Sequence, residues 1–193
     1  MSLQPISDYS FDDYLAAERE LIDEKHEYIG GEVFAMAGGS FEHNLIVSNL
    51  IRGLGNSLGG SPCMALPSDM RVRIEATNAG TYPDIVVLCD PPIFHDDRRD
   101  TIINPTLLIE VLSPSTEGYD RGSKFALYRT LRSLKQYIMV AQDRISVDVY
   151  TREDSNRWLL TAYDQIDSNI TFDTISCAVP MTEIYDRVPF DRT

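Results

Sequence analysis

The sequence predicts an α/β domain in which a mixed central β-sheet is flanked by helices. Strand-like runs of apolar and β-branched residues gather in the middle and the last third of the chain, and amphipathic helices precede and interrupt them. One helix separates two of these runs, as in a parallel crossover, whereas the later runs follow each other through short polar turns, as antiparallel strands do. Because 193 residues are enough for one sizeable core, we expect a single domain over residues 1–193.

The first part of the chain is expected to form a helix, a hairpin and a second helix. These elements cover residues 11–20 (helix), 27–29 and 33–36 (hairpin) and 41–58 (helix). Gly30 and Gly31 provide the glycine turn of the hairpin. Ser40 is a suitable N-cap for the second helix, which the sequence Gly59-Gly60-Ser61-Pro62 ends.

The remaining strands follow from hydrophobic runs bounded by turn residues. They are expected at residues 63–66, 69–74, 82–88, 106–112, 136–140, 145–150 and 158–163. The first two are expected to pair with each other. Residues 90–104 are expected to form a polar, mobile loop with little to bury, and a short helix is expected near residues 182–185.

The strand at residues 106–112 carries one carboxylate in an otherwise apolar or β-branched run. Side chains of a strand alternate between its faces, so Glu110 shares a face with Leu108 and Leu112. A run of this kind is typical of a strand that is covered on both faces. A glutamate there is costly unless it is paired or binds a cation, so Glu110 is a candidate functional residue.

A second acid and a lysine are expected near Glu110. Asp84 opens another buried-type strand, directly after Pro83. Lys124 lies in the helix after the Glu110 strand, whose apolar positions include Phe125, Tyr128 and Leu131. On a helical projection Lys124 falls between these apolar positions, on the side that faces the sheet. There it either extends to the margin of the sheet or points at an acid.

The composition is that of a globular protein. Hydrophobic residues make up 43% and charged residues 24% of the chain, and no run approaches the roughly 18 apolar residues that span a bilayer. Residues 1–5 lack the basic start and apolar run of a signal peptide. The three cysteines, Cys63, Cys89 and Cys177, are expected to be buried thiols in a reducing compartment. We therefore expect a cytoplasmic protein with no membrane contact.

The charge is distributed unevenly along the chain. The formal net charge is −13, which argues against non-specific nucleic-acid binding by the whole surface. Residues 121–144 differ, because they hold six basic residues and a single acid. This basic zone either faces a polyanion or is a solvated surface paired with acids elsewhere.

Two carboxylates on neighbouring strands with a lysine beside them favour a hard divalent cation bound through oxygen. Mg²⁺ takes one or two carboxylates, with waters and a substrate phosphate completing its shell. Such an ion lowers the pKa of a bound water and stabilises charge on a phosphoryl group. A nearby lysine orients the water or neutralises the phosphate. Two carboxylates, a divalent cation and a lysine are the groups with which an enzyme hydrolyses a phosphodiester bond.

The motifs around these residues resemble the Uma2 family, a branch of the PD-(D/E)XK nuclease superfamily. The resemblance rests on Pro83-Asp84 followed 26 residues later by Glu110-Val111-Leu112-Ser113-Pro114-Ser115. It extends over most of the chain, through residues 31–40, His43, residues 68–72, 120–128 and 136–140. It implies a restriction-endonuclease-like fold and a metal-dependent endonuclease that cuts DNA. It also implies that Mg²⁺ is the cofactor, with Mn²⁺ able to substitute.

The resemblance also implies roles for individual residues. Asp84 and Glu110 are expected to hold the metal, and Lys124 is expected to aid activation of the water. Glu32 and His43 match family positions and are candidate supporting residues. The superfamily often dimerises, so a homodimer is a further expectation.

One departure from the superfamily pattern leaves a second function open. The superfamily lysine stands two residues after the second acid, where this chain has Leu112. Lys124 therefore supplies the amine from the following helix, or the site is degenerate and the chain is a nucleic-acid or protein-binding module. A glycosidase that uses the two acids as acid and base is a third alternative, which explains neither the lysine nor the lack of an aromatic sugar platform.

Overall fold

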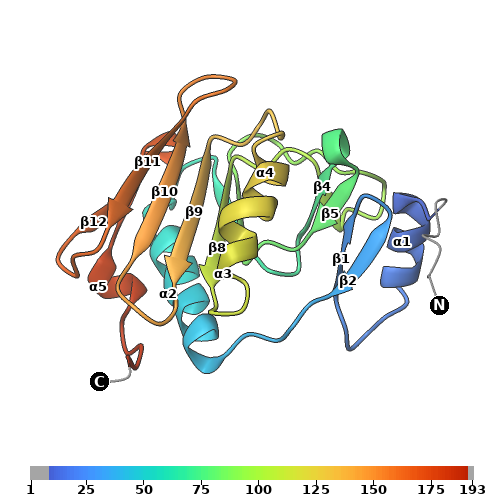
Figure 1. Cartoon of the computed structure of the whole chain (residues 1–193). Coiled ribbons are helices and arrows are strands. Elements are labelled where there is room, and N and C mark those ends of the chain that lie inside the picture. Colours follow the sequence, from blue (N-terminus) through green and yellow to red (C-terminus); the bar gives the residue numbers. More distant parts are fainter. Residues whose placement is uncertain (1–8, 191–193) are drawn as a thin grey trace.

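A six-stranded mixed sheet forms the centre of the molecule (Figure 1). The structure is a computed structural model, and it describes residues 9–190. The strand order is β11-β10-β9-β8-β6-β3. These strands are β3 (Met64–Pro67), β6 (Ile85–Leu88), β8 (Leu107–Leu112), β9 (Gln136–Ala141), β10 (Val147–Arg152) and β11 (Trp158–Tyr163). β8 and β9 are parallel and the other neighbours are antiparallel, so the α/β fold class with a mixed sheet is confirmed.

The crossover from β8 to β9 contains the expected helix, in a shorter and interrupted form. It consists of α3 (Glu117–Tyr119), a π-helical turn (Asp120–Lys124) and α4 (Phe125–Tyr128). The expectation that the helix includes Leu131 is wrong, because Leu131 and the next apolar residue, Leu134, follow its end at Tyr128. Both are nevertheless buried, so the apolar spacing reflected burial of the segment rather than its helical conformation.

The two faces of the six-stranded sheet are covered by different elements. On β8, Leu107, Ile109 and Val111 belong to a core shared with α2 (Phe41–Ser57) and α5 (Met181–Ile184). That core also includes a hairpin that the sequence did not predict, β12 (Asn169–Phe172) and β13 (Cys177–Pro180). Leu108 and Leu112 belong to the opposite core, with Tyr128 of α4. The alternation predicted for this strand is therefore present, and Glu110 faces the second core.

A five-stranded sheet completes this second core. Its order is β2-β1-β5-β4-β7, with β1 (His26–Ile29), β2 (Glu32–Ala35), β4 (Arg71–Ile74), β5 (Ala79–Thr81) and β7 (Thr101–Ile102). The predicted pairing of strands 63–66 and 69–74 is wrong, because β3 pairs with β6 and β4 pairs with β5. Val72 and Ile74 of β4 share a core with side chains of the six-stranded sheet. β4 therefore lies over the face of that sheet rather than beside β3.

The loop at residues 90–104 is also better anchored than expected. Thr101 and Ile102 are fully buried in β7, which pairs with β4. Asp100 accepts hydrogen bonds of 2.6 and 2.7 Å from the Arg19 guanidinium. The expectation of little to bury is wrong here, because the short β7 strand closes one edge of the five-stranded sheet.

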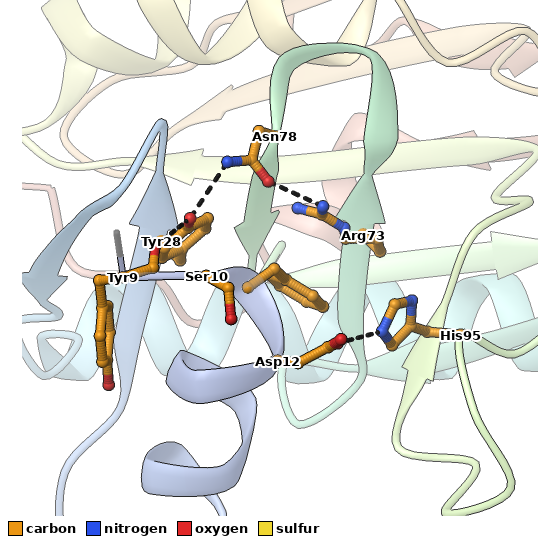
Figure 2. A pocket seen from close by; sticks show the side chains of 8 residues that line it. Tyr9, Ser10, Asp12, Tyr28, Arg73, Asn78 and His95 are labelled. Carbon is orange, nitrogen blue, oxygen red and sulfur yellow. Dashed lines mark hydrogen bonds and ion pairs between the residues drawn. The ribbon is translucent and has the colours of Figure 1, made fainter. Parts of the chain in front are cut away.

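Helix α1 (Phe11–Glu18) packs on the outer face of the five-stranded sheet, where Phe11 contacts Tyr28 of β1. Figure 2 shows a pocket of about 460 Å³ at the start of this helix. In it His95 points toward Asp12, and Arg73 bonds to Asn78. Tyr28 and its neighbour Glu27 lie on opposite faces of β1. The pocket and the Glu27 side chain therefore lie on opposite sides of the five-stranded sheet.

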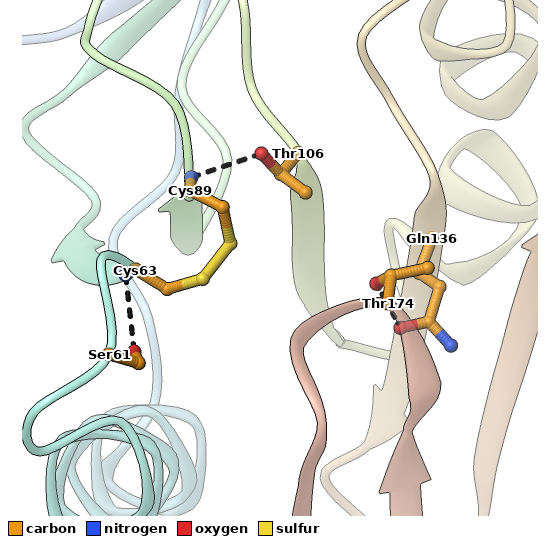
Figure 3. The surroundings of a disulfide bond; sticks show 6 residues. All are labelled: Ser61, Cys63, Cys89, Thr106, Gln136 and Thr174. Atoms are coloured by element: carbon orange, nitrogen blue, oxygen red, sulfur yellow. Dashed lines mark hydrogen bonds between the residues drawn. A yellow bond between two sulfur atoms is a disulfide. The ribbon is translucent and has the colours of Figure 1, made fainter.

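Two of the three cysteines form a disulfide, so the expectation of three thiols is wrong for this pair. Met64 of β3 lies opposite Leu88 of β6, and this register brings Cys63 and Cys89 together at the ends of the two strands. They are bonded in the structure (Figure 3). Cys177 is a free buried thiol, as expected. The spacing along the sequence did not reveal the pair because its proximity depends on strand pairing.

The helices are short, and within residues 9–190 none is long and apolar enough to cross a membrane. The longest is α2, with 17 residues. Residues 1–5, on which the absence of a signal peptide was judged, lie outside the part of the chain that the structure describes.

Candidate active site

Asp84, Glu110 and Lys124 come together between the two sheets. β6 and β8 pair with Ile85 opposite Ile109, so Asp84, just before β6, lies beside Glu110 of the neighbouring strand. The Val111 backbone N–H donates to Asp84 Oδ2 at 2.7 Å. Lys124 Nζ lies 3.0 Å from Glu110 Oε1. The acids and the lysine singled out in the sequence therefore share one site.

The π-helical turn delivers Lys124 into this site. Such turns add one residue to a helical turn and are frequent at functional sites. Lys124 ends the turn and Asp120 begins it, and both side chains are buried. Their carboxylate and ammonium lie 3.8 Å apart, four positions apart in the sequence. The lysine thus enters from above the sheet, and Leu112 of β8 remains an apolar core residue.

Two further acids, Glu27 and Asp120, complete a cluster that the sequence did not predict. Glu27 Oε1 lies 3.1 Å from Lys124 Nζ. Only Asp120 carried a sequence signal, because it stands at the i,i+4 spacing from Lys124 that places two side chains on one helix face.

Tyrosine hydroxyls hold this cluster in place. The Tyr128 hydroxyl donates to Glu110 Oε1 at 2.8 Å. The Tyr119 hydroxyl donates to Glu27 Oε2 at 3.2 Å. Because these phenols come from the same crossover as Lys124, the helix that supplies the amine also fixes two of the acids.

The site holds more buried carboxyl groups than buried cations. Burial raises the pKa of Glu110 to about 8; Lys124 opposes this, while the nearby carboxylates of Asp84, Asp120 and Glu27 add to it. Burial also raises the pKa of Asp120. For Lys124 burial acts in the other direction, but Glu110, Glu27 and Asp120 outweigh it and raise its pKa well above the usual range. One lysine, held charged, is therefore shared among three buried carboxyl groups.

His43 lies at the margin of the site and contacts Asp84. It is in the first turn of α2, where Ser40 caps the helix as expected, and its Nε2 lies 3.0 Å from Asp84 Oδ1. Burial lowers the pKa of His43, but the hydrogen bond and charge of Asp84 outweigh this and leave the pKa raised. The two oxygens of Asp84 are thus held by the imidazole and by the Val111 amide.

Glu32 is not brought into this group. It is exposed on β2, next to the hairpin turn and opposite Ile29. Within residues 9–190 no hydrogen bond or ion pair connects its side chain with Asp84, Glu110 or Lys124. Of the two supporting residues expected from the sequence, only His43 therefore contacts the trio.

The donor atoms fit a hard cation that is held by few protein ligands. In the described part of the chain no group of three or more His, Cys, Asp or Glu side chains is arranged to hold a metal ion by itself. Asp84 and Glu110 offer carboxylate oxygens on adjacent strands, and Mg²⁺ commonly uses only one or two carboxylates. Burial is the main cause of the raised pKa of Glu110, and the neighbouring carboxylates add to it; a cation between Asp84 and Glu110 would oppose both effects.

The fold is shared with a solved structure. The crystal structure of a "putative nuclease belonging to DUF820" from Anabaena variabilis superposes with a TM-score of 0.73, over 91% of this chain and 97% of that one. The two sequences are 18% identical, so the likeness shows the fold alone.

Two proteins of Synechocystis sp. are related more closely in sequence. The protein slr1290 is 38% identical over 188 residues, which cover 96% of both chains. The protein sll1609 is 38% identical over 149 residues, which cover 77% of this chain and 84% of that protein. The relationship thus extends along nearly the whole chain.

The model of the Uma2 family, described as "Putative restriction endonuclease", matches residues 11–180. This match includes the strands and the crossover that carry Asp84, Glu110 and Lys124. The function of the chain is therefore nuclease-like. By its sequence over nearly its whole length, this chain belongs to the Uma2 family.

Proposed function

We propose that the chain is a Mg²⁺-dependent endonuclease that hydrolyses phosphodiester bonds in DNA. The observation that carries this proposal is the buried cluster in which a single lysine faces Glu110, Glu27 and Asp120 beside Asp84. Such an excess of buried carboxylates is costly without a cation. The cluster also contains the acid pair and the amine that phosphodiester hydrolysis requires.

In this proposal Asp84 and Glu110 hold Mg²⁺, for which Mn²⁺ can substitute. When bound, the ion would lower the pKa of the attacking water and stabilise negative charge on the phosphate. His43 and the Val111 amide hold the Asp84 carboxylate in position through its two oxygens. Tyr128 does the same for Glu110 through its hydroxyl.

Lys124 contributes a positive charge that does not depend on the metal. The neighbouring carboxylates keep its pKa well above the usual range, so the amine is an ammonium at neutral pH. A buried ammonium interacts strongly with a phosphate or a water because little solvent screens it. We assign Lys124 to orienting the attacking water and neutralising the phosphate.

DNA is proposed as the substrate because the family is described as restriction endonucleases and because basic side chains remain exposed on the crossover side. Of the six basic residues in the 121–144 zone, Arg121 and Arg144 pair with acids, and Lys124 is buried. The three that remain are Arg129, Arg132 and Lys135, all exposed. The homodimer expected from the superfamily stays a prediction, which light scattering of the purified protein tests.

A degenerate nuclease that only binds nucleic acid is the second candidate. It is favoured by the engagement of Glu110 Oε1, which already accepts from Tyr128 and pairs with Lys124. In a degenerate site Lys124 would act as a permanent replacement for the metal. The two candidates differ in whether the site takes up a divalent ion.

Substitution of the site residues tests the proposal. Asp84→Asn and Glu110→Gln should each abolish tight Mn²⁺ binding, measured by calorimetry, and cleavage of a labelled DNA. Lys124→Met, which preserves the packing of the stem, should retain Mn²⁺ binding and lose cleavage by about 100-fold or more, the scale of one positioned catalytic group.

Glu32→Gln is the matched control, since it removes an exposed acid that lies outside the cluster. It should bind Mn²⁺ and cleave like the wild type. Unchanged Mn²⁺ binding in both Asp84→Asn and Glu110→Gln would remove the site assignment. Full cleavage by Lys124→Met would reduce the lysine to a packing role.

A further inference from the structure

A second feature, a basic groove, lies at the end of the six-stranded sheet where β9 begins and β10 ends. Its volume is about 920 Å³, and its walls are the segment after α4 and the turn between β10 and β11. In Figure 1 both segments lie at the upper end of that sheet. The walls include Arg129, Arg132, Lys135, Arg152 and Trp158.

The cations of this groove are not neutralised by carboxylates. Within residues 9–190, Arg129, Arg132 and Lys135 form no ion pair. The two acids on the facing turn, Glu153 and Asp154, instead pair with Arg157, at 3.8 and 2.7 Å. The lining thus holds four basic and two acidic side chains, an excess of positive charge in a chain whose net charge is −13.

The floor of the groove is held by Arg152. Its guanidinium donates to the backbone carbonyls of Leu134 and Arg129 at 2.8 Å and of Leu131 at 2.9 Å. These bonds fix the segment that carries the exposed cations. The same guanidinium lies 4.3 Å from the centre of the Trp158 ring, whose edge-to-face partner is Phe125, with ring centres 5.3 Å apart. Trp158 is thus a fixed, half-buried aromatic among cations.

From this combination we infer that the groove binds a single-stranded stretch of nucleic acid. Phosphates would lie on the three exposed cations, and a base would lie against the part of the half-buried Trp158 ring that Arg152 and Phe125 leave exposed, because aromatic side chains and cationic grooves are how proteins hold single strands. A duplex is less suited, since its base faces are stacked inside the helix. The inference rests on the nuclease function proposed above, in that the bound strand is part of the substrate.

The groove lies close enough to the candidate active site to act with it. Lys124 is the residue before α4 and Arg129 the residue after it, so one short helix joins the two. At 1.5 Å per residue their backbones are roughly 8 Å apart along the helix axis. The groove and Lys124 thus lie at the two ends of one short helix.

Trp158 provides a direct measurement, because it is the only tryptophan in the chain. Titration of the full-length protein in EDTA with a single-stranded oligonucleotide should quench its fluorescence and saturate. A duplex of the same sequence should bind several-fold more weakly. The apparent affinity should fall with salt, with a slope in log–log form of about −0.7 for each phosphate contact.

Variants locate the binding. Arg132→Ala and Lys135→Ala should each weaken binding several-fold. Each should also reduce the slope of log affinity against log salt by the contribution of about one phosphate contact. Arg98→Ala removes an arginine that is equally exposed but lies outside the groove, and it should change neither quantity. In Glu110→Gln the oligonucleotide should quench Trp158 fluorescence as in the wild type, while DNA cleavage is lost. The two measurements therefore test the nuclease proposal and the binding of nucleic acid in the groove separately.

Three results would overturn the inference. The first is binding by fluorescence anisotropy without quenching of Trp158, which places the nucleic acid elsewhere. The second is equal affinity for inorganic polyphosphate, which reduces the groove to a general polyanion or acidic-peptide site. The third is an equal loss of affinity in Arg98→Ala and Arg132→Ala, which makes the effect one of overall charge.

Discussion

At the scale of single residues, the candidate site is a problem of charge balance around Lys124. One ammonium contacts Glu110 and Glu27 at 3.0 and 3.1 Å, and a third carboxyl group, that of Asp120, lies at 3.8 Å. Removal of one partner from a buried ion pair costs about 3–5 kcal/mol because the other charge is left uncompensated. A divalent ion beside this cluster is the simplest compensation for the carboxylates that Lys124 cannot neutralise.

The raised pKa of Glu110 predicts how the metal-free protein responds to pH. Burial raises the pKa of Glu110 in the folded protein to about 8, above the ordinary glutamate pKa of 4.5, so the folded protein binds a proton that the unfolded chain has released. Stability is therefore highest below about pH 5 with respect to this group and falls as the pH rises to 8. The free energy of unfolding changes by at most about 1.4 kcal/mol per pH unit. Each kcal/mol corresponds to roughly 2–4 °C in Tm.

Thermal unfolding in EDTA between pH 5 and 8 measures this slope. Glu110→Gln has no titrating group at this position, so its Tm should vary less over that range than that of the wild type. Saturating Mn²⁺ should raise the wild-type Tm most at the upper end of the range, where the carboxylates are ionised. A wild type and a variant with parallel profiles would show that Glu110 is ionised throughout.

Residue by residue, the sequence located part of this cluster and missed part of it. Glu110 was identifiable because a single acid in an apolar run needs a partner. Glu27 was harder to identify, because its strand has only four residues and gives no apolar run against which the acid would stand out. Its relation to Lys124 depends on the packing of the five-stranded sheet over the crossover, which no local pattern reveals.

At the scale of elements, the π-helical turn and the disulfide have the largest consequences. The turn between α3 and α4 carries Lys124 at its end and Asp120 at its start, so both side chains reach the same buried space. The sequence predicted a regular helix here, because apolar spacing does not distinguish an α-helical from a π-helical turn.

The disulfide between Cys63 and Cys89 should stabilise the pairing of β3 with β6. It closes a loop with a sequence separation of 26 residues. The chain-entropy model gives such a loop about 3.5 kcal/mol, or roughly 7–14 °C in Tm. Unfolded, non-reduced protein should show one titratable thiol, that of Cys177, and three after reduction.

A Cys63→Ser/Cys89→Ser variant supplies the comparison. It should unfold at the temperature of the reduced wild type and should not respond to dithiothreitol. Three thiols in the non-reduced wild type, with a Tm that dithiothreitol leaves unchanged, would show that the two cysteines are not bonded in the purified protein.

The elements were predictable to different degrees for physical reasons. The strands from β8 to β11 were recognised from hydrophobic runs bounded by turn residues, and the helix α2 from its periodic apolar face. The partners of β3 and β4 were not, because pairing is decided by contacts distant in the sequence. β7 has two residues, which is too short for a periodic signal.

At the scale of the whole molecule, the two sheets create the site. The six-stranded sheet supplies Glu110, the five-stranded sheet supplies Glu27, and the crossover lies against both and supplies Lys124. The fold class followed from the order of elements, whereas the space between the sheets did not. The basic groove lies at the far end of the same crossover, so substrate contacts and chemistry would be connected by one short helix.

We propose that Asp84 and Glu110 hold a divalent cation beside Lys124, and anomalous scattering from crystals soaked in Mn²⁺ locates that cation. A peak is expected between the Asp84 and Glu110 carboxylates of the wild type, and none there in Glu110→Gln. No peak at this position in fully soaked wild-type crystals would exclude a metal held by these two acids and leave a site in which Lys124 replaces the metal.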